Sequence, residues 1–354
     1  MYPLNSSTPW PVNQWYIAGF SSEVTRTLQV RTFLNRRVLL FRDEQGTAHA
    51  LSSICPHRMM PLELGSLVGD RLVCGYHGLT FDTAGTCVDA PTSSQVPRCA
   101  LTVFPLRESS PLLWIWLGDP QRADATPLPP QDAIGVGTPG WLTQCVEHYQ
   151  LKARYTLLID NLFDLSHLGF IHASIVGAGG ISLVKPTIEK REDRLVVSRT
   201  LVDVPADGFQ RLLFPSSGER MSVSLSTELV GISLINAGGP YFDGPRLESP
   251  LLVHLNFIHA ITPETEHSTH YWILMTRDFR TDDAHLSGAL AAQNVAVVAQ
   301  DRTTLEAIEQ LLQEGGNLPR EISMQSDTGA IRARLRIMQM IRNDGHTTQV
   351  AEQA

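Results

Sequence analysis

Two short segments of this chain each combine one cysteine with one histidine. Cys55-Pro-His57 is followed, after sixteen intervening residues, by Cys74-Gly-Tyr-His77. Thiolates and imidazoles are the ligands that proteins use for zinc and for some iron–sulfur clusters. The four side chains are therefore predicted to hold one metal centre between two loops.

The order of these ligands along the chain favours one kind of centre. Tetrahedral zinc is the alternative, but zinc fingers usually pair cysteine with cysteine and histidine with histidine. One cysteine and one histidine in each loop fit a Rieske [2Fe–2S] cluster, in which one iron takes both thiolates and the other both imidazoles. Pro56 would stiffen the first loop, while Gly75 and Gly78 would let main-chain amides approach the cluster.

A second group of potential ligands follows in the segment from Asp160 to His172. His167 and His172 lie five residues apart, with Asp160 and Asp164 upstream. Two imidazoles and one carboxylate are the ligand set of non-haem iron(II) oxygenases. In a regular helix five residues turn the chain by about 500°, which leaves the two rings roughly 140° apart. We therefore expect the chain to bend near Gly169, where a Cβ is missing.

The segments that must position these residues predict two domains. Short strands separated by turns such as Asp43-Glu-Gln-Gly46 indicate an all-β module over residues 1–120. A proline-rich linker over 121–140 leads into a catalytic domain over 141–354. The strands expected in the first domain are 14–20, 37–42, 49–52, 72–74, 79–82 and 112–117.

The second domain is expected to combine a larger sheet with late helices. Alternating segments predict strands at 194–204, 221–235, 251–261 and 269–276. Helices are expected at 283–312, ended by Gly315 and Gly316, and at 328–341, capped by Asp327. The predicted fold class is therefore α+β: an N-terminal all-β Rieske domain followed by an α+β catalytic domain with an antiparallel sheet flanked by helices.

Composition excludes several classes of protein. The net charge is −8 and no Lys/Arg cluster is present, which argues against a nucleic-acid partner. No apolar run approaches the ~18 residues of a membrane helix, and no secretory signal opens the chain, so a cytoplasmic protein is expected. Five cysteines make a disulfide framework improbable in that compartment. Cys87, Cys99 and Cys145 lie at no ligand spacing and are expected to be buried small side chains.

The two ligand groups, in this order and at this separation, resemble those of the Rieske non-haem iron oxygenase α-subunits over nearly the whole chain. Further segments are most similar to the vanillate O-demethylase branch, which includes dicamba and aryl-sulfonate methyl monooxygenases. These segments are Asn13-Gln-Trp-Tyr, Ile261-Thr-Pro-Glu-Thr-Glu266 and Gln300-Asp-Arg-x-x-Leu-Glu306.

The resemblance selects a ligand that spacing leaves open. Asp164, three residues before His167, is the natural local carboxylate, and Asp160 and Asp301 are alternatives. The resemblance implies that His167, His172 and Asp301 bind Fe²⁺.

The same resemblance gives Asp164 another role. It implies a head-to-tail homotrimer, in which Asp164 bridges His167 to His77 of the partner subunit and so carries electrons between the two centres. Asp160 and Asn161 would either support the ligands by hydrogen bonds or, for Asp160, cap a helix.

The implied reaction is O₂-dependent O-demethylation of a methoxylated aromatic acid of the vanillate or isovanillate type to a phenol and formaldehyde. Electrons would come from NAD(P)H through a separate flavin and iron–sulfur reductase, because the chain has no GxGxxG nucleotide loop. Alternatives are methyl hydroxylation, N-demethylation or ring dihydroxylation. A Rieske electron-transfer protein and a zinc-binding interaction module are alternatives of another class.

Two residues are predicted to line the substrate pocket. His259 matches a pocket position of the dicamba and vanillate relatives and would bind a carboxylate or phenol oxygen, although a core histidine satisfied by the main chain is the alternative. Asn236 is the second candidate. Near Ala291 and Ala292, where the dicamba relative has a pocket aromatic, this chain has only small residues, which argues against dicamba as the substrate.

Overall fold

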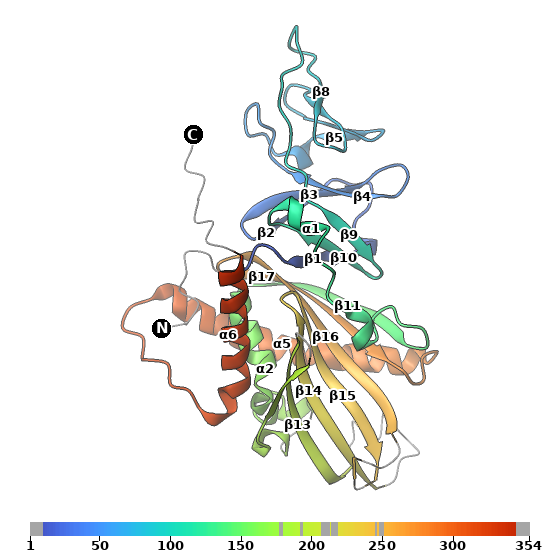
Figure 1. The fold of residues 1–354 in the computed structure, drawn as a ribbon, viewed down its shortest axis with the longest axis vertical. Coiled ribbons are helices and arrows are strands. Elements are labelled where there is room, and N and C mark those ends of the chain that lie inside the picture. Colours follow the sequence, from blue (N-terminus) through green and yellow to red (C-terminus); the bar gives the residue numbers. More distant parts are fainter. Residues whose placement is uncertain are drawn as a thin grey trace. The chain divides into compact units, whose positions relative to one another are not determined.

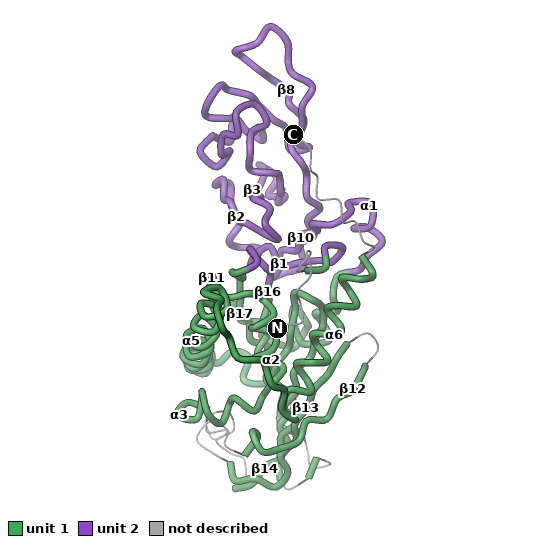
Figure 2. The backbone as a smooth tube through the Cα atoms, turned by 90° about the vertical axis from the view of Figure 1, so that its left-hand side faces the viewer, with its two compact units in different colours: residues 1–11, 128–261, 267–354 green, residues 12–127, 262–266 purple. Residues whose placement is uncertain are grey.

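A computed structural model describes residues 10–176, 180–191, 194–206, 213, 219–244, 246–247 and 251–344. The chain forms two compact units (Figure 2). The smaller unit comprises Val12–Pro127 with Thr262–Glu266, and the larger comprises Met1–Pro11, Leu128–Ile261 and His267–Ala354. Within the described ranges, no helix has the length and apolar character needed to cross a membrane.

The smaller unit is built from short antiparallel strands in three sheets, ordered β1-β10-β9, β2-β3-β4 and β5-β6-β7-β8. The strands are β1 (Trp15–Phe20), β2 (Gln29–Phe33), β3 (Arg36–Arg42), β4 (Ala48–Ser52), β5 (Ser66–Val68), β6 (Arg71–Val73), β7 (Thr80–Phe81), β8 (Cys87–Asp89), β9 (Leu106–Ser109) and β10 (Leu112–Trp116).

All six strands predicted for this region are present, with ends that differ by at most one residue. Every residue of β1 and β10 is buried, because the side chains on both faces of this pair are covered. The turn after Asp43 forms the β3–β4 hairpin, and Gly46 adopts the positive φ of +85° that the turn requires. β2, β5, β8 and β9 were not predicted, because they are short and lack a run of buried residues.

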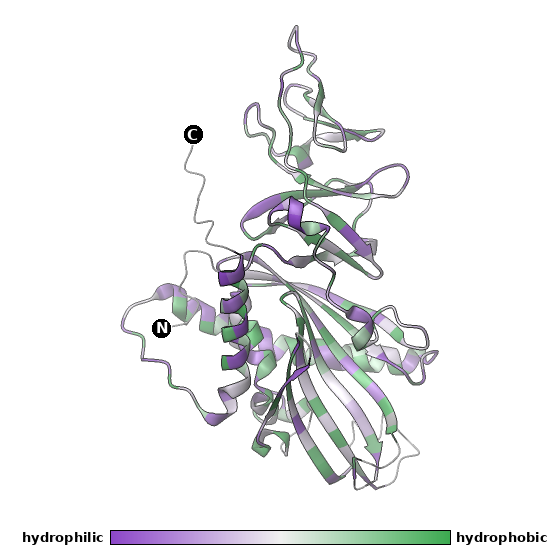
Figure 3. Cartoon of the chain, in the orientation of Figure 1, coloured by the Kyte–Doolittle hydropathy of each residue, from purple (hydrophilic) through white to green (hydrophobic). Residues whose placement is uncertain are grey.

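The larger unit is organised around a seven-stranded sheet in the order β11-β17-β16-β15-β14-β13-β12 (Figure 1). Its strands are β11 (Leu142–Leu151), β12 (Thr187–Arg191), β13 (Arg194–Pro205), β14 (Arg220–Gly231), β15 (Leu234–Asp243), β16 (Leu251–Thr265) and β17 (Ser268–Arg277). Hydrophobic and hydrophilic residues alternate along several of these strands (Figure 3), as expected for a sheet with two different faces. The predicted α+β fold class is confirmed.

Two helices pack against the same face of this sheet. Thr227 of β14 donates a hydrogen bond of 2.7 Å to the carbonyl of Leu162 in α2 (Tyr155–Phe163). Val223, four residues earlier on the same strand, shares a core cluster with Leu286 and Leu290 of α5 (Ala284–Glu314). Residues four apart on a strand point to one face, so α2 and α5 both cover the face that carries Val223 and Thr227.

The long helix α5 has a polar interruption in its buried stripe. It begins at Asp283, whose carboxylate accepts a 2.8 Å hydrogen bond from the amide of Leu286, and ends at Gly315, as predicted. Its buried residues recur every three or four positions: Leu286, Leu290, Asn294, Val298, Asp301, Leu305 and Glu309. A buried polar residue is more informative than a buried leucine, and Asn294 and Asp301 face the functional site.

Some expectations need correction. The segment predicted as one strand over 221–235 is a hairpin, β14 and β15, with its turn at Ile232 and Ser233. Asp327 occupies the N-cap position of α6 (Thr328–Asn343), but its carboxylate accepts from the amide of Met324 rather than from α6. The proline-rich stretch contains a short helix, α1 (Pro120–Ala123), and a 3₁₀ turn at Gln131–Ile134.

The segment Ile261–Glu266 links the two units covalently. β16 continues past the sheet, and Thr262 Oγ1 donates a 2.7 Å hydrogen bond to the carbonyl of Ile17 in β1. The amide of Leu34 donates to the carbonyl of Pro263 at 2.9 Å. Residues 262–266 therefore belong to the smaller unit although they follow a strand of the larger one.

Candidate active site

Two histidines of the larger unit lie just beyond the end of α2. The helix ends at Phe163, and a 3₁₀ helix runs from Leu165 to Gly169. The two histidine rings meet edge to face with centroids 5.1 Å apart. The chain bends between His167 and His172 as expected, and the 3₁₀ helix ends at Gly169.

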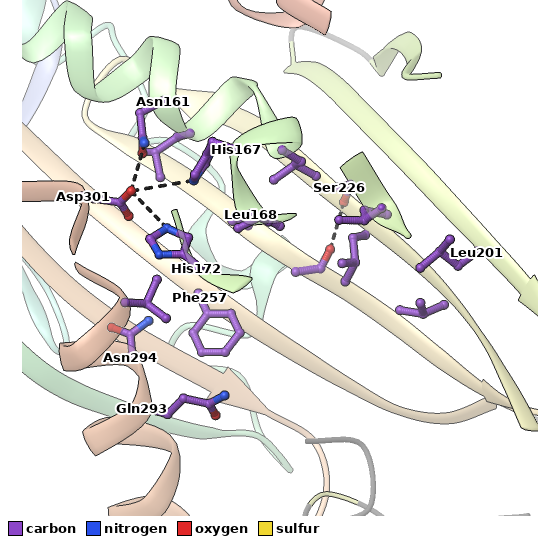
Figure 4. A pocket seen from close by; sticks show the side chains of 18 of the residues that line it. Asn161, His167, Leu168, His172, Leu201, Ser226, Phe257, Gln293, Asn294 and Asp301 are labelled. Atoms are coloured by element: carbon purple, nitrogen blue, oxygen red, sulfur yellow. Dashed lines mark hydrogen bonds and ion pairs between the residues drawn. The ribbon is translucent and has the colours of Figure 1, made fainter. Parts of the chain in front are cut away.

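Asp301 reaches these histidines from the middle of α5. Its Oδ1 atom lies 3.0 Å from Nε2 of His172 and 3.7 Å from Nε2 of His167. One potential ligand atom from each of the three residues lies within 4.8 Å of the others. The structure thus brings together the two imidazoles and the one carboxylate that the resemblance implied (Figure 4).

The second nitrogen of each ring has a partner that sets its orientation. Nδ1 of His167 hydrogen-bonds the main-chain carbonyl of Asp164. Nδ1 of His172 lies 2.8 Å from Oε1 of Gln300. A proton on each Nδ1 would leave both Nε2 atoms, which face Asp301, free as ligands.

This donor set fits a mononuclear iron(II) ion. Burial lowers the pKa of His167, although the negative charge of Asp301 acts in the opposite direction. The lowered pKa favours the neutral imidazole that a metal binds. Two imidazoles and one carboxylate on one side of the ion leave other coordination positions open.

Asn161 and Asp160, adjacent on α2, differ in what they contact. Asn161 Nδ2 donates a 3.0 Å hydrogen bond to Oδ1 of Asp301, so it can orient the carboxylate. The carboxylate of Asp160 instead binds the guanidinium of Arg334 in α6, with Nε at 2.7 Å. Asp160 lies inside α2 rather than at its N-cap, and its carboxylate points toward α6.

Asp164 contacts His167 through its main chain and not through its carboxylate. Oδ1 and Oδ2 accept hydrogen bonds from the amide and hydroxyl of Ser166 at 3.0 and 2.8 Å. The buried guanidinium of Arg199 lies 3.4 Å from Oδ1. The side chain remains 22% exposed.

A cavity of about 470 Å³ opens beside the three residues. Its walls come from α2, the 3₁₀ helix, β13 to β16 and α5. Most lining residues are apolar, including Leu168, Leu201 and Phe257 (Figure 4). Among the described lining residues there is no lysine or arginine.

His259 lines this cavity and Asn236 does not. His259 Nδ1 makes a short hydrogen bond with the hydroxyl of Tyr271, and burial lowers the pKa of His259 to about 4, so the imidazole is neutral near pH 7. On β15 the lining residues are Ala237, Gly238 and Tyr241. Asn236 precedes Ala237 and points to the opposite face of the sheet. The prediction that Asn236 lines the pocket is wrong.

Sequence reasoning missed three polar residues of α5 around this site. Gln300 supports His172, and Gln293 and Asn294 line the cavity. Gln293 and Asn294 precede Asp301 by eight and seven residues, about two helical turns. That spacing is a signal the sequence carried, although it has meaning only once Asp301 is a ligand.

The smaller unit holds the four cysteine and histidine residues on two loops that follow β4 and β6. Each loop has the same main-chain pattern. The amide of Cys55 donates to the carbonyl of Met60 and the amide of Met59 to that of Cys55. In the second loop, the amide of Cys74 donates to the carbonyl of Leu79, and the amide of Gly78 donates to the carbonyl of Cys74.

These four residues fit a Rieske cluster. Cys55 and Cys74 are 1% and 3% exposed, and burial raises the pKa of the Cys55 thiol. The ring centroids of His57 and His77 are 4.6 Å apart, and both rings lie near the surface. Nδ1 of His77 is buried and has no hydrogen-bond partner within the described ranges, as expected of an atom that serves as a ligand.

The remaining cysteines differ in exposure. Cys87 is buried and Cys99 is partly buried beside it, but Cys145 is exposed. The expectation that Cys145 is buried is therefore wrong. It lies on β11, at the edge of the seven-stranded sheet and next to a register shift before Glu147.

Comparisons with known proteins agree with both sites. The Rieske [2Fe-2S] domain family matches residues 14–105, and the family of the vanillate O-demethylase oxygenase C-terminal domain matches residues 151–343. A zinc module and a protein limited to electron transfer are therefore wrong as alternatives.

Relatives match along most of the chain. The putative toluene-4-sulfonate monooxygenase system iron-sulfur subunit TsaM2 of Comamonas testosteroni is 33% identical, over 90% of this chain and 93% of that protein. The dicamba O-demethylase oxygenase component of Stenotrophomonas maltophilia is 32% identical, over 84% of this chain and 87% of that protein. A crystal structure of dicamba monooxygenase bound to 3,6-dichlorosalicylic acid has a TM-score of 0.84 and 27% identity, over 95% of this chain and 99% of that one. The chain belongs to the Rieske non-haem iron oxygenases, in the vanillate O-demethylase branch, and is the oxygenase component of a multicomponent monooxygenase.

Proposed function

We propose that this protein removes the methyl group of a methoxylated aromatic acid and releases a phenol and formaldehyde. The observation that carries the proposal is the position of His167, His172 and Asp301 at the wall of an apolar cavity of about 470 Å³, a volume within the usual range of small-molecule sites. The match to the vanillate O-demethylase oxygenase C-terminal domain supports this reaction class.

His167, His172 and Asp301 would hold Fe²⁺, and Cys55, His57, Cys74 and His77 would hold the Rieske cluster. When bound, these groups activate O₂ with electrons that the cluster delivers. In the overall reaction one oxygen atom enters the methyl C–H bond and the other leaves as water, with two electrons and two protons consumed. The resulting hemiacetal breaks its C–O bond to give the phenol and formaldehyde.

The chain's own contribution is to hold the substrate in a dry cavity with its methyl group toward the three ligands. Phe257 and the neighbouring aliphatic side chains exclude water from the ring. Burial keeps Tyr271 protonated by raising its pKa, so its hydroxyl can donate to Nδ1 of His259. His259 Nε2 would then carry a proton and donate it to a carboxylate or phenol oxygen of the substrate.

We propose that the electrons originate from NAD(P)H and arrive through a separate reductase. We also propose a head-to-tail homotrimer, in which the carboxylate of Asp164 accepts a hydrogen bond from His77 of the partner subunit. Support comes from the partial exposure of the Asp164 side chain and from its main-chain bond to His167, which together provide a short route to the three ligands.

The test is a panel of methoxybenzoates supplied to the enzyme with a compatible reductase. We expect formaldehyde and the corresponding phenol in equal amounts, with one O₂ consumed for each. His172→Ala, which removes a ligand, is the control and should release no formaldehyde. A cis-dihydrodiol product would contradict the proposal, because it requires oxygenation of the ring.

A second candidate is oxygenation of an aryl methyl group, favoured by the 33% identity to the toluene-4-sulfonate monooxygenase subunit. The same cavity would then hold a substituted toluene with its methyl group toward Asp301. Product analysis with 4-methylbenzoate and toluene-4-sulfonate separates the candidates, because methyl hydroxylation gives a benzylic alcohol and no formaldehyde.

A further inference from the structure

The cavity wall contributed by α5 contains a side-chain amide without a hydrogen-bond partner among the described residues. Asn294 is 6% exposed and lines the cavity. Its Oδ1 atom is buried without a hydrogen-bond partner, and no side-chain hydrogen bond of Asn294 is present among the described residues. Leaving a buried amide unpaired costs free energy, so such a residue needs an explanation.

The other polar side chains of the cavity have partners. Gln293 Nε2 donates to the carbonyl of Ile175, Ser226 Oγ donates to the carbonyl of Gly238, and His259 is bonded to Tyr271. Asn161 is bonded to Asp301. Among these described polar groups, Asn294 differs in that neither end of its amide has a hydrogen-bond partner, whereas the Asn161 amide lacks one only at its oxygen.

The position of Asn294 relates it directly to the proposed iron ligands. It precedes Asp301 by seven residues on a continuous helix. Seven residues make almost two full turns, so both side chains lie on one face of α5, about 10 Å apart along its axis. Figure 4 shows the amide on the same wall as Asp301, beyond His172, with its nitrogen end toward Phe257 and the cavity.

We propose that Asn294 is a specificity-determining residue whose amide nitrogen donates a hydrogen bond to an acceptor group on the substrate ring, meta or para to the group that is oxygenated. The inference rests on the proposed function and names the substrate class for that site. Carboxylate, sulfonate and amide carbonyl groups are the acceptors that such a donor recognises.

The separation of the two ends of the site determines the ring positions. One end of the ring must lie at the three ligands and the other at Asn294, about two helical turns away. Meta and para substituents project from the far side of the ring and can reach Asn294. An ortho substituent projects beside the methoxy group, toward the ligands, and cannot contact Asn294 at the same time.

The experiment measures binding to the intact, metal-loaded protein without O₂, so that it does not depend on turnover. Calorimetric titrations would compare 4-methoxybenzoate, 2-methoxybenzoate and methoxybenzene. We expect the wild type to bind 4-methoxybenzoate more tightly than either other compound. Asn294→Leu, which keeps the approximate volume, should weaken binding of 4-methoxybenzoate by about tenfold to a hundredfold, the usual effect of losing a hydrogen bond to a charged group. Its affinity for methoxybenzene should not change.

The matched control is Gln293→Leu, because the Gln293 amide is adjacent and already donates to Ile175. It should leave the ratio between 4-methoxybenzoate and methoxybenzene nearly unchanged. Asn294→Asp provides a second variant if leucine disturbs folding, and it should reject 4-methoxybenzoate more strongly than the uncharged 4-methoxybenzamide. Iron content and the visible spectrum of the cluster report correct folding in each variant.

The proposal is overturned if the wild type shows no preference for 4-methoxybenzoate over methoxybenzene, or if Asn294→Leu and Gln293→Leu lose the same affinity. Formaldehyde release is recorded separately with each bound compound. Selective binding that depends on Asn294 supports the inference even where no formaldehyde appears, and that combination contradicts only the O-demethylation proposed above.

Discussion

The two ligand sets of this protein are built in opposite ways. The cluster ligands lie between Cys55 and His77, on two loops with one shared main-chain pattern. The three proposed iron ligands come from a bent segment after α2 and from Asp301 on α5, 129 residues beyond His172. The first set is a property of a short stretch of chain, whereas the second exists only when a sheet and two helices have packed.

This difference implies that the two sites can be lost independently. In Asp301→Ala we expect turnover to fall by more than about 100-fold, because even changes behind metal ligands cost roughly 10–100-fold. The visible spectrum of the Rieske cluster should remain. Cys74→Ser is the reciprocal variant and should lose the cluster spectrum while the other site still binds iron. Loss of both centres in either variant, measured as iron and sulfide content, would show that the sites depend on each other.

Asp164 is where the two sites are proposed to meet, and Asp164→Asn should nearly abolish turnover while both centres stay occupied. The reason is that an amide is a weaker acceptor than a carboxylate in the proposed bond to His77 of the partner subunit. Ser166→Ala, which removes a neighbour of the same carboxylate, is the control and should have a small effect. If electron transfer from the reduced cluster stays fast in single turnover of Asp164→Asn, the bridging role is wrong.

The assembled site also depends on residues that hydrogen-bond its ligands. Asn161→Leu removes the hydrogen bond to Asp301, and we expect iron affinity to fall by roughly 10–100-fold. Competition with a chelator measures this affinity, and the cluster spectrum is the internal control. Unchanged iron affinity would show that Asp301 is held by the helix alone.

The packing of α2 against α6 should make the larger unit sensitive to pH. Burial raises the pKa of Asp160 to about 6 in spite of Arg334. This value lies above the usual ~3.9 of an unfolded chain, so the folded state takes up a proton between about pH 4 and 6 and the stabilising contribution of Asp160 decreases as pH rises through that range. Arg334→Met removes the guanidinium and should raise this pKa further.

The expected loss in Arg334→Met is about 3 kcal/mol of unfolding free energy at pH 8, where Asp160 is left charged and unpaired. At pH 6 the loss should be smaller, because the carboxyl is partly protonated. Denaturant unfolding at pH 8 and pH 6 measures the loss at each pH. Asp160→Asn combined with Arg334→Met should make the loss equal at the two pH values. An equal loss at both pH values would contradict this role of Asp160.

The two cluster loops provide the smallest test. Met59 and Gly78 occupy equivalent places with φ of +55° and +76°, but a Cβ on Gly78 would lie 2.7 Å from Cγ of Pro91. Gly78→Ala should therefore destabilise the smaller unit by roughly 1–3 kcal/mol, and Met59→Ala should have little effect on the backbone. Thermal loss of the cluster spectrum compares the two. If both variants lost the cluster spectrum at the same temperature, the contact with Pro91 would not make Gly78 more sensitive than Met59.

The sequence by itself determined the features that depend on neighbours along the chain. The Cys and His spacing predicted the cluster loops, alternating apolar residues predicted most strands, and Gly315 predicted the end of α5. The five-residue spacing of His167 and His172 also required a bend that the structure shows. Each of these follows from local geometry, because turn, strand and helix periods act over a few residues.

Only the tertiary structure decided which polar residues face each other. Spacing favoured Asp164 as the third carboxylate, and only the family resemblance pointed to Asp301. Packing brings Asp301 to the histidines and turns Asp160 toward Arg334. The same packing places Asn294 in the cavity and Asn236 on the other face of the sheet. The physical reason is that strand register and helix rotation are set by burial of the whole core, which no local pattern contains.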